Sequence, residues 1–328
     1  MNSLFEEISD KFPRFCLINN PSPLRRLRRL EEYFNYSLPI YMKSDDAISA
    51  LSSSKLRYLE FILGDYFLSS YDCIVHATTA HSNYLAQIAF VSAQLGIRCV
   101  LGVSRTAGSA DTINLSLAKR YGAEIIISSN APSELREEIT IDLQSQGQRP
   151  YVVRAPFNNV AGIMGLLHGY AEFLRQTENA PIPRCRFYCC SSGNSYLGLS
   201  VANYIFDTGN EVIGVAPIRF EDAGLYNVAG SRSEMLKHRL AGFSELAGYN
   251  FLANIGKIEI DESFVGPGYG KPSQATKEST RLLAELDGVL LDHTYTAKAM
   301  ARLISDLKKG EVRLPIVFWH SGGVSNAL

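Results

Sequence analysis

Residues 73–103 read CIVHATTAHSNYLAQIAFVSAQLGIRCVLGV, and this stretch predicts a strand, a helix and a second strand. CIVHA (73–77) and RCVLGV (98–103) are continuous apolar runs, which is typical of strands buried on both faces in a parallel sheet. Between them we expect a helix from about Asn83 that ends near Gly96, a residue suited to a helix C-cap. Two strands joined through a helix form a unit that places them parallel in one sheet.

The same alternation continues to residue 153, breaks at TENAPIPR (177–184), which resembles a linker, and resumes at residue 186. Further strands are expected at residues 124–128, 151–153, 186–190, 211–215, 288–292 and 315–319. Further helices are expected around residues 113–122, 133–146, 197–206, 280–288 and 296–310. We therefore predict an α/β protein with two open, twisted, mostly parallel sheets flanked by helices, in two domains with a cleft between them.

Composition and charge indicate an ordinary globular protein and argue against some classes of partner. The 328 residues are 46% apolar and 20% charged, and 32 basic against 33 acidic residues give a formal net charge of −1. That balance gives no reason to expect nucleic acid or an acidic membrane as a partner. The arginines of PLRRLRRL (23–30) interleave with leucines, as on the solvated face of a short amphipathic segment.

We expect neither a signal peptide nor a membrane-spanning segment in this sequence. The first residues, MNSLFEEISDKF, carry acidic side chains and no apolar core of a signal peptide. No apolar run approaches the roughly 20 residues that a membrane-spanning helix needs. The six cysteines show no disulfide framework, and those at 185, 189 and 190 fit buried positions in and near a strand. We expect a cytoplasmic protein.

Lys55 in SSSKLRYLEF (52–61) is the first candidate for chemistry. Apolar residues at 56, 59, 63 and 67 recur at helical spacing, so we expect a helix that begins near Lys55, buries that stripe and is capped by one of the serines. A helix N-terminus disfavours an ammonium, which would make the amine a readier nucleophile for a carbonyl. By itself, however, an exposed lysine that tolerates a small penalty is the stronger interpretation.

Small polar residues follow two of the expected strands. TTAHSNYLAQ (78–87) follows the first strand, at the edge where open α/β sheets bind ligands. Ser82 there is also a natural helix N-cap, and His81 alone is more often structural than catalytic. CSSGNSYLGL (190–199) leads from a strand into a helix whose N-terminus could receive a phosphate, although ordinary turn chemistry would produce the same pattern.

Three more segments place tyrosine, threonine, serine and histidine at loops and strand ends. GPGYG (266–270) holds Tyr269 on a shaped loop, LLDHTYTAKAM (290–300) carries Tyr295 and Thr296, and FWHSGG (318–323) carries Ser321. Each segment alone could be a turn or a cap.

In this order, the motifs resemble the D-cysteine desulfhydrase and 1-aminocyclopropane-1-carboxylate (ACC) deaminase family. This family belongs to the fold-type II enzymes that use pyridoxal 5'-phosphate (PLP), the tryptophan synthase β-like group. The resemblance covers nearly the whole chain and rests on an ordered set of segments. They are PSPLRRLRRL (21–30), IYMKSDD (40–46), SSSK (52–55), HSNY (81–84), CSSGNS (190–195), GPGYG (266–270), DHTYTAK (292–298) and HSGG (320–323).

The resemblance implies a role for each matching residue, with the active site in the interdomain cleft. Lys55 would hold PLP as a Schiff base and later move protons. Asn83 would bind the ring hydroxyl of PLP, and Thr296 or Ser321 would face the pyridine nitrogen. The phosphate would be held by Ser192, Gly193, Asn194 and Ser195. The residues expected to face the substrate are Ser82, His81, Tyr84, Tyr269 and Tyr295, of which Ser82 would touch the carboxylate or act near the cofactor.

The resemblance also implies an organisation and an activity. Residues 1–58 and 170–328 would form a large PLP-binding domain and residues 59–169 a small domain, in a homodimer. The expected activity is that of a PLP-dependent lyase or deaminase, which removes an α-proton from a small amino acid and eliminates from its β- or γ-carbon. A threonine at 296, where ACC deaminases usually carry glutamate, makes a weaker electron sink and favours elimination over ring opening.

Departures from the family pattern keep two alternatives open. The two glycines and the asparagine that precede the lysine are serines here, and His81 replaces a glutamine and could act as an acid or base. Such changes crowd the site and suggest a different substrate. One alternative is a biosynthetic PLP enzyme that carries out β-replacement or cyclisation. The other is a catalytically degenerate homologue that only binds a ligand or a partner.

Overall fold

The computed structural model describes residues 2–49, 53–105, 111–223 and 229–323, and within these ranges it leaves out the side chains of residues 155–157. The chain divides into two compact units, which are described separately. The first contains Met1–Lys11, Ile18–Tyr58 and Asn159–Leu328, and the second contains Phe12–Leu17 and Leu59–Asn158.

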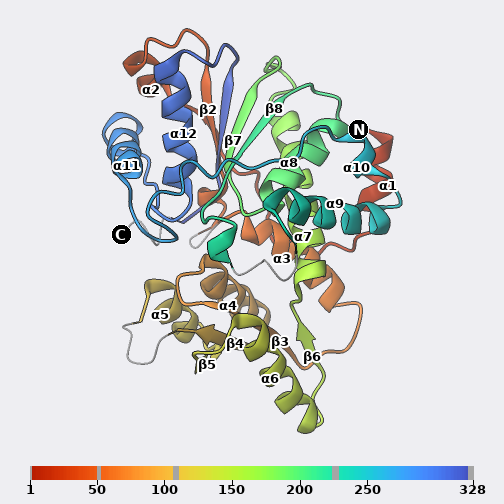
Figure 1. The fold of residues 1–328 in the computed structure, drawn as a ribbon. Helices are drawn as coiled ribbons and strands as arrows, with labels where there is room; N and C mark the ends of the chain where they lie inside the picture. Colours follow the sequence, from red (N-terminus) through yellow and green to blue (C-terminus); the bar gives the residue numbers. More distant parts are fainter. Residues whose placement is uncertain (1, 50–52, 106–110, 224–228, 324–328) are drawn as a thin grey trace. The chain divides into compact units, whose positions relative to one another are not determined.

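The first unit contains a five-stranded sheet in the order β1-β2-β9-β7-β8 (Figure 1). All neighbours in it run parallel except β1, which pairs antiparallel with β2. The strands are β1 (Leu24–Arg26), β2 (Ile40–Ser44), β7 (Arg186–Cys190), β8 (Glu211–Val215) and β9 (Ile316–His320). The helices are α1 (Ser3–Ser9), α2 (Arg28–Tyr33), α8 (Asn194–Ile205), α9 (Arg232–Ala247), α10 (Phe251–Asn254), α11 (Gln274–Asp287) and α12 (Thr296–Lys309). Two more helices contribute residues to both units, α3 (Lys55–Tyr66) and α7 (Ala155–Gln176).

The sheet of the first unit is buried on both faces, and strand β9 shows how. Ile316 and Phe318 join a core built with α2, α11 and α12, because alternate residues of a strand point to the same face. Trp319 points to the opposite face, where it lies with Phe187 in a cluster of aromatic rings that includes Phe173 of α7. All five residues of β9 are buried, as the continuous apolar run PIVFW predicts.

The second unit contains a four-stranded parallel sheet in the order β5-β4-β3-β6. Its strands are β3 (Cys73–Thr79), β4 (Arg98–Ser104), β5 (Glu124–Ser128) and β6 (Pro150–Val152), and its helices are α4 (Asn83–Leu95), α5 (Ile113–Arg120) and α6 (Pro132–Ser145). Helix α6 packs closely on β4, since a Cβ at Gly102 would lie 2.9 Å from Leu135 Cγ and 3.0 Å from Ile139 Cδ1. Ser82 caps α4 and Gly96 ends it in a left-handed conformation, as the sequence predicts.

The predicted fold class is confirmed, with two mostly parallel sheets flanked by helices, and two expectations are wrong. Residues 288–292 are not a strand: they connect α11 to α12, and their apolar run is explained by Val289 and Leu291, which are buried in the core without strand pairing. Phe67 lies just beyond the end of α3 and is 50% exposed, so the buried stripe consists of Leu56, Leu59 and Leu63 only. Strand β2 and helices α1, α7, α9 and α10 were not predicted.

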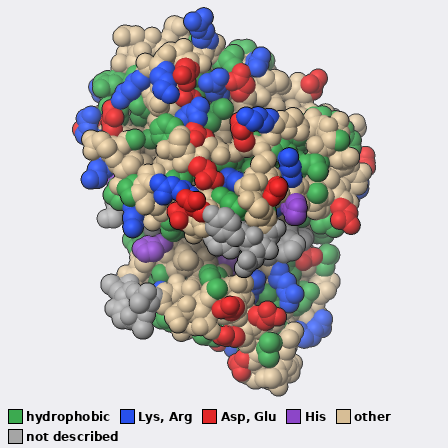
Figure 2. All heavy atoms as spheres, in the orientation of Figure 1, with side chains coloured by type: hydrophobic (Ala, Val, Ile, Leu, Met, Phe, Trp, Pro, Cys, Tyr) green, Lys and Arg blue, Asp and Glu red, His purple; other side chains and the backbone are tan. Residues whose placement is uncertain are grey.

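The surface agrees with the charge balance of the sequence. Basic and acidic side chains are interspersed over the face shown in Figure 2. The arginines of the 23–30 segment are exposed, while Leu27 and Leu30 are buried, although the segment divides between β1 and α2. Within the described ranges, no helix combines the length and the apolar character that crossing a bilayer requires.

Candidate active site

Lys55 is the first residue of α3, and two serines determine how the chain enters this helix. The Ser53 hydroxyl accepts the backbone N–H of Lys55 at 3.0 Å, and the Ser54 N–H donates to the carbonyl of Ser321 at 3.0 Å. Ser53 also forms an antiparallel bridge with Gly322. The HSGG segment therefore runs alongside the residues before Lys55. Ser52, the third serine considered as a cap, lies outside the described residues.

The amine of Lys55 is held in a form that suits attack on a carbonyl. Its Nζ lies 4.5 Å from the centroid of the Tyr58 ring, one helical turn further along α3. Burial, with the positive charge of Arg239 as the second cause, lowers the pKa of Lys55 to about 8. A larger share of this amine is therefore neutral and nucleophilic near neutral pH than for an ordinary lysine.

The loop between β7 and α8 is joined to the helix of Lys55. The hydroxyls of Tyr58 and Ser195 are 3.1 Å apart. The Ser191 hydroxyl accepts from the N–H groups of Gly193 (2.9 Å) and Tyr196 (3.1 Å), which shapes the turn that residues 192–195 follow. Gly193 has a φ of 151°, a conformation that side chains rarely adopt, and as the N-cap of α8 it provides no side-chain cap. Loop and helix together offer a small-residue cradle at a helix N-terminus.

Tyr269 and Tyr295, predicted to act together, are in contact. Their hydroxyls are hydrogen-bonded, and their rings meet edge-on with centroids 5.9 Å apart. Lys298, which the sequence analysis left without a role, is fully buried, and its Nζ donates to the carbonyls of Pro217 (2.6 Å) and Gly268 (3.0 Å). It thus fastens the GPGYG loop to α12 next to Tyr269, although burial lowers its pKa.

The two candidates for the pyridine nitrogen differ in their hydrogen bonds. The Thr296 hydroxyl donates to Asp292 Oδ1 at 2.8 Å and accepts the Asp292 N–H at 3.0 Å, so its proton is already used. Ser321 is partly exposed, and its hydroxyl has no hydrogen-bond partner among the described residues. Of the two, Ser321 is better placed to offer a hydroxyl proton to a ligand.

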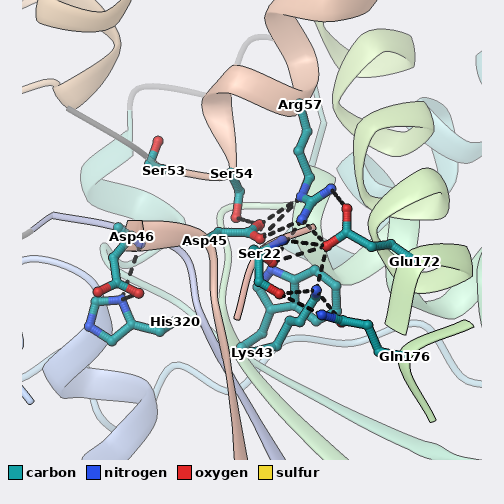
Figure 3. A network of polar contacts seen from close by, with 12 residues as sticks. Ser22, Lys43, Asp45, Asp46, Ser53, Ser54, Arg57, Glu172, Gln176 and His320 are labelled. Atoms are coloured by element: carbon teal, nitrogen blue, oxygen red, sulfur yellow. Dashed lines mark hydrogen bonds and ion pairs between the residues drawn. The ribbon is translucent and has the colours of Figure 1, made fainter. Parts of the chain in front are cut away.

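Ser54 and Arg57, which lie on either side of Lys55 in the sequence, join a largely buried network of charged side chains, drawn in Figure 3. Arg57 donates to Asp45, with the shorter contact at 2.7 Å, and to Glu172 at 3.0 Å. Lys43 is fully buried and pairs with Glu172 as well. Burial raises the pKa of Asp45, but Arg57, Lys43 and Ser54 together outweigh burial and hold that pKa at about 2. Ser54 donates its hydroxyl to Asp45 at 2.7 Å, which ties the residue before Lys55 to the network.

The outer members of the network complete its hydrogen bonds. Trp319 of β9 donates its indole N–H to Asp45 at 2.9 Å, and Gln176 of α7 accepts from Lys43 at 2.6 Å. Beside the network, Nδ1 of the buried His320 lies 3.2 Å from Asp46 Oδ1 (Figure 3). The network therefore joins β2, α3, α7 and β9 around the segment that presents Lys55.

The remaining sequence candidates lie in the second unit, at the end of β3. His81 is exposed, and Ser82 caps α4 by accepting the N–H of Tyr84 at 3.3 Å. Asn83 Oδ1 accepts from Asn114 of α5 at 3.1 Å, a partner that sequence reasoning missed. Tyr84 is buried, and its hydroxyl donates to Asn158 at 3.0 Å, so its ring is packed within this unit.

The residues of the first unit fit a phosphate-bearing aldehyde. A lysine of lowered pKa supplies the amine, and the loop of small residues at the start of α8 suits a phosphate. A Cβ at Gly193 would lie 2.3 Å from Arg239 Nη1, so the guanidinium would have to move, and a φ of 151° would also strain the side chain. This unit therefore contains an amine and a helix N-terminus whose chemistry suits the aldehyde and the phosphate of PLP.

Comparison with known proteins agrees with this chemistry. A family model described as "Pyridoxal-phosphate dependent enzyme" matches residues 16–322. The chain is 31% identical over 323 residues to proteins named D-cysteine desulfhydrase from Salmonella typhi and from Klebsiella pneumoniae strain 342, covering 95% of this chain and 94% of each relative.

Solved structures give the same result for the fold. An ACC deaminase homologue superposes with a TM-score of 0.87 at 25% identity, covering 100% of this chain and 97% of the other. A hydrogen sulfide-producing enzyme from Fusobacterium nucleatum superposes with a TM-score of 0.64 at 16% identity, covering 100% of each chain, which supports the fold alone. The chain belongs to the pyridoxal-phosphate-dependent enzymes, in the branch that contains the D-cysteine desulfhydrases and the ACC deaminases.

Proposed function

We propose that this PLP-dependent enzyme is a lyase or deaminase that removes the α-proton of a small amino acid and eliminates a group from its β- or γ-carbon. The observation that carries the proposal is Lys55, an amine of lowered pKa joined through Tyr58 to the loop at residues 191–195. Relatives named D-cysteine desulfhydrase make amino acids with a β-thiol the first substrates to test.

The residues of the first unit would have the following roles in catalysis. When bound, PLP supplies the electron sink that acidifies the Cα–H of the amino acid. Lys55 Nζ would hold the cofactor and, once the amino group of the substrate has displaced it, would take the α-proton. The backbone and hydroxyls of Ser192, Gly193, Asn194 and Ser195 would hold the phosphate.

The remaining roles concern the electron sink and the substrate. Of Thr296 and Ser321, Ser321 would face the pyridine nitrogen, because the Thr296 hydroxyl already donates to Asp292. A neutral hydroxyl there would keep the electron sink weak, which favours elimination over ring opening. The hydrogen-bonded pair Tyr269 and Tyr295 faces the substrate and can pass a proton to the leaving group.

We further propose roles for the second unit and the wider assembly. Ser82 would contact the substrate carboxylate, Asn83 the ring hydroxyl of PLP, and His81 and Tyr84 would shape the substrate pocket. The large PLP-binding domain would comprise residues 1–58 and 170–328, and the small domain residues 59–169. The family relationship supports these roles, a homodimer and a cytoplasmic location. Light scattering on the purified protein would test the homodimer.

Absorbance spectroscopy tests the central proposal. The purified protein, supplied with PLP, should show the visible-edge band of a lysine-bound cofactor, and borohydride reduction or Lys55→Ala should abolish that band. Keto acid and ammonia should then appear from one member of a panel of D- and L-amino acids that begins with D-cysteine. A wild-type protein that never develops the band would overturn the proposal.

The same experiment separates two alternatives. A biosynthetic β-replacement or cyclisation enzyme would bind PLP and change its spectrum with an amino acid, but would release no keto acid. A homologue that only binds a ligand or partner would show neither spectral change nor product. The serines at 53 and 54, which motivated this last possibility, both make hydrogen bonds that position the start of α3.

A further inference from the structure

Arg239 projects from α9 onto the backbone of the loop that leads into α8. Its Nη1 is 3.3 Å from the carbonyl of Ser192 and 3.3 Å from Asn194 Oδ1. The guanidinium also occupies the space where a Cβ of Gly193 would be, 2.3 Å from that position. Glycine at 193 therefore lets the arginine lie directly against the loop.

Among the described residues, no carboxylate pairs with Arg239. The two buried arginines do have such partners: Arg57 pairs with Asp45 and Glu172, and Arg232 with Glu262. Arg239 forms no ion pair within the residues that the structure describes. Burial, and then repulsion from Arg232 on the same helix, lower its pKa to about 10. An unpaired, desolvated cation opposes folding, so its position calls for an anion that neutralises it.

The geometry identifies that anion by its chemistry. Arg239 and the N-terminal end of α8 border the same loop at residues 192–194, and a planar guanidinium suits two phosphate oxygens. The charge of Arg239 is also among the causes that lower the pKa of Lys55, so both cations belong to one electrostatic environment. A phosphate dianion at the loop would relieve the unfavourable charge of both.

We propose that Arg239 is a direct ligand of the cofactor phosphate and makes the site select a phosphorylated aldehyde over its unphosphorylated form. The proposal rests on the proposed function, in which the loop at 192–195 holds the phosphate of PLP. It adds a charged side chain from α9, far away in sequence, to a site otherwise built from backbone and hydroxyl groups.

The test compares PLP with pyridoxal, which lacks the phosphate. Both dissociation constants are measured by absorbance titration of wild-type apoprotein and of Arg239→Gln. The ratio of the two constants is the readout, because any change at Lys55 affects both aldehydes alike. Arg239→Gln should reduce the preference for PLP by about 10-fold to 100-fold, the range for a lost hydrogen bond to a charged group. Arg239→Lys should restore part of it.

Lys237→Gln is the matched control, since it removes a positive charge from an exposed position of the same helix. Its preference should equal that of wild type. An unchanged ratio in a folded Arg239→Gln would overturn the proposal, and so would an equal loss for both aldehydes. These outcomes differ from failure of the proposed function, in which wild-type protein would bind neither aldehyde at Lys55.

A second measurement needs only wild-type protein and covers the case in which the variants do not fold. An arginine-specific dicarbonyl reagent should modify Arg239 in apoprotein, and peptide mass spectrometry would locate the modification. Inorganic phosphate, and more strongly PLP, should protect Arg239 from the reagent, while pyridoxal should not. Modification of Arg239 at the same rate with and without PLP would contradict a direct phosphate contact.

Discussion

Arg57 and Lys55 lie two residues apart on α3, yet the charged groups around them differ in sign. Arg57 contacts two carboxylates, Asp45 and Glu172, and every cation of that network has an anionic partner. Lys55 shares its electrostatic environment with another cation, Arg239, and its pKa falls to about 8 as a result of burial and that charge. The network joins β2, α3, α7 and β9, whereas Arg239 lies against the loop before α8, which is suited to an anion.

This difference distinguishes buried charges that stabilise the fold from buried charges that are available to bind a ligand. A compensated charge is costly to disturb, because removing one partner leaves the other buried and unpaired. An uncompensated charge destabilises the free protein and recovers that free energy when its ligand binds. We therefore expect variants of the network to change stability, and variants around the loop to change affinity and rate.

The largest effect is expected for Asp45→Asn, which leaves Arg57 with one of its two carboxylates. Breaking a buried ion pair costs about 3–5 kcal/mol in the free energy of unfolding. Urea unfolding of the apoprotein measures that loss. Glu124→Gln is the control, because its pair with Arg98 is 51% and 38% exposed and should contribute at most about 1 kcal/mol. Equal losses in the two variants would contradict the comparison.

The pH dependence of stability sharpens the same prediction. The pKa of Asp45 lies at about 2 in the folded protein, below the usual 3.8. A carboxyl group whose pKa is lower in the folded protein stabilises the fold at pH values above its pKa in the unfolded chain. This stability is lost as the pH falls through the pKa of the folded protein. The stability difference between wild type and Asp45→Asn should persist down to about pH 4 and shrink between pH 4 and pH 2. A difference that vanishes already at pH 5 would assign the effect to another group.

The second effect concerns Lys298, a buried cation paired with backbone carbonyls instead of carboxylates. Lys298→Met removes the bonds to Pro217 and Gly268 that hold the GPGYG loop. Tyr269 would shift, and a misplacement of about 1 Å can reduce the rate by about 100-fold. We expect kcat to fall by that order while PLP affinity stays unchanged. Lys308→Met, at an exposed position of the same helix, should change neither.

The network around Asp45 and the contacts of Lys298 also show what could and could not be predicted from the sequence. The strands and helices followed from periodicity, which is local, so CIVHA and PIVFW were assigned correctly. The strand expected at 288–292 was wrong because an apolar run records burial, as of Val289 and Leu291, but not whether a strand distant in sequence pairs with it. A signal for the network was present in IYMKSDD, where Lys43 and Asp45 accompany an apolar run. Arg239 and Lys298 act through tertiary contacts that no local pattern records.

A third, smaller effect should appear in the pH dependence of aldehyde capture by apoprotein. An amine of pKa about 8 is about half neutral at pH 8, whereas one at the usual 10.5 is only about 0.3% neutral. The rate of pyridoxal capture should therefore rise tenfold per pH unit up to about pH 7.5 and level off above pH 8. Free Nα-acetyl-lysine, the control, should keep rising beyond pH 10. A protein profile that follows the free lysine would contradict the lowered pKa of Lys55.

The smallest effects are expected for two neighbouring serines. Ser54 contacts the charged network, and Ser53 contacts the backbone of Lys55. Ser54 donates to Asp45 of the network, so Ser54→Ala should cost about 1.5–3 kcal/mol of stability, as for a hydrogen bond to a charged group. Ser53 accepts the N–H of Lys55, so Ser53→Ala should cost only about 1 kcal/mol, as for a lost cap. Urea unfolding measures both losses, and PLP titration measures the affinity of each variant. If Ser53→Ala is the more destabilising change, the stability of this segment comes from the helix cap, and the network is secondary to it.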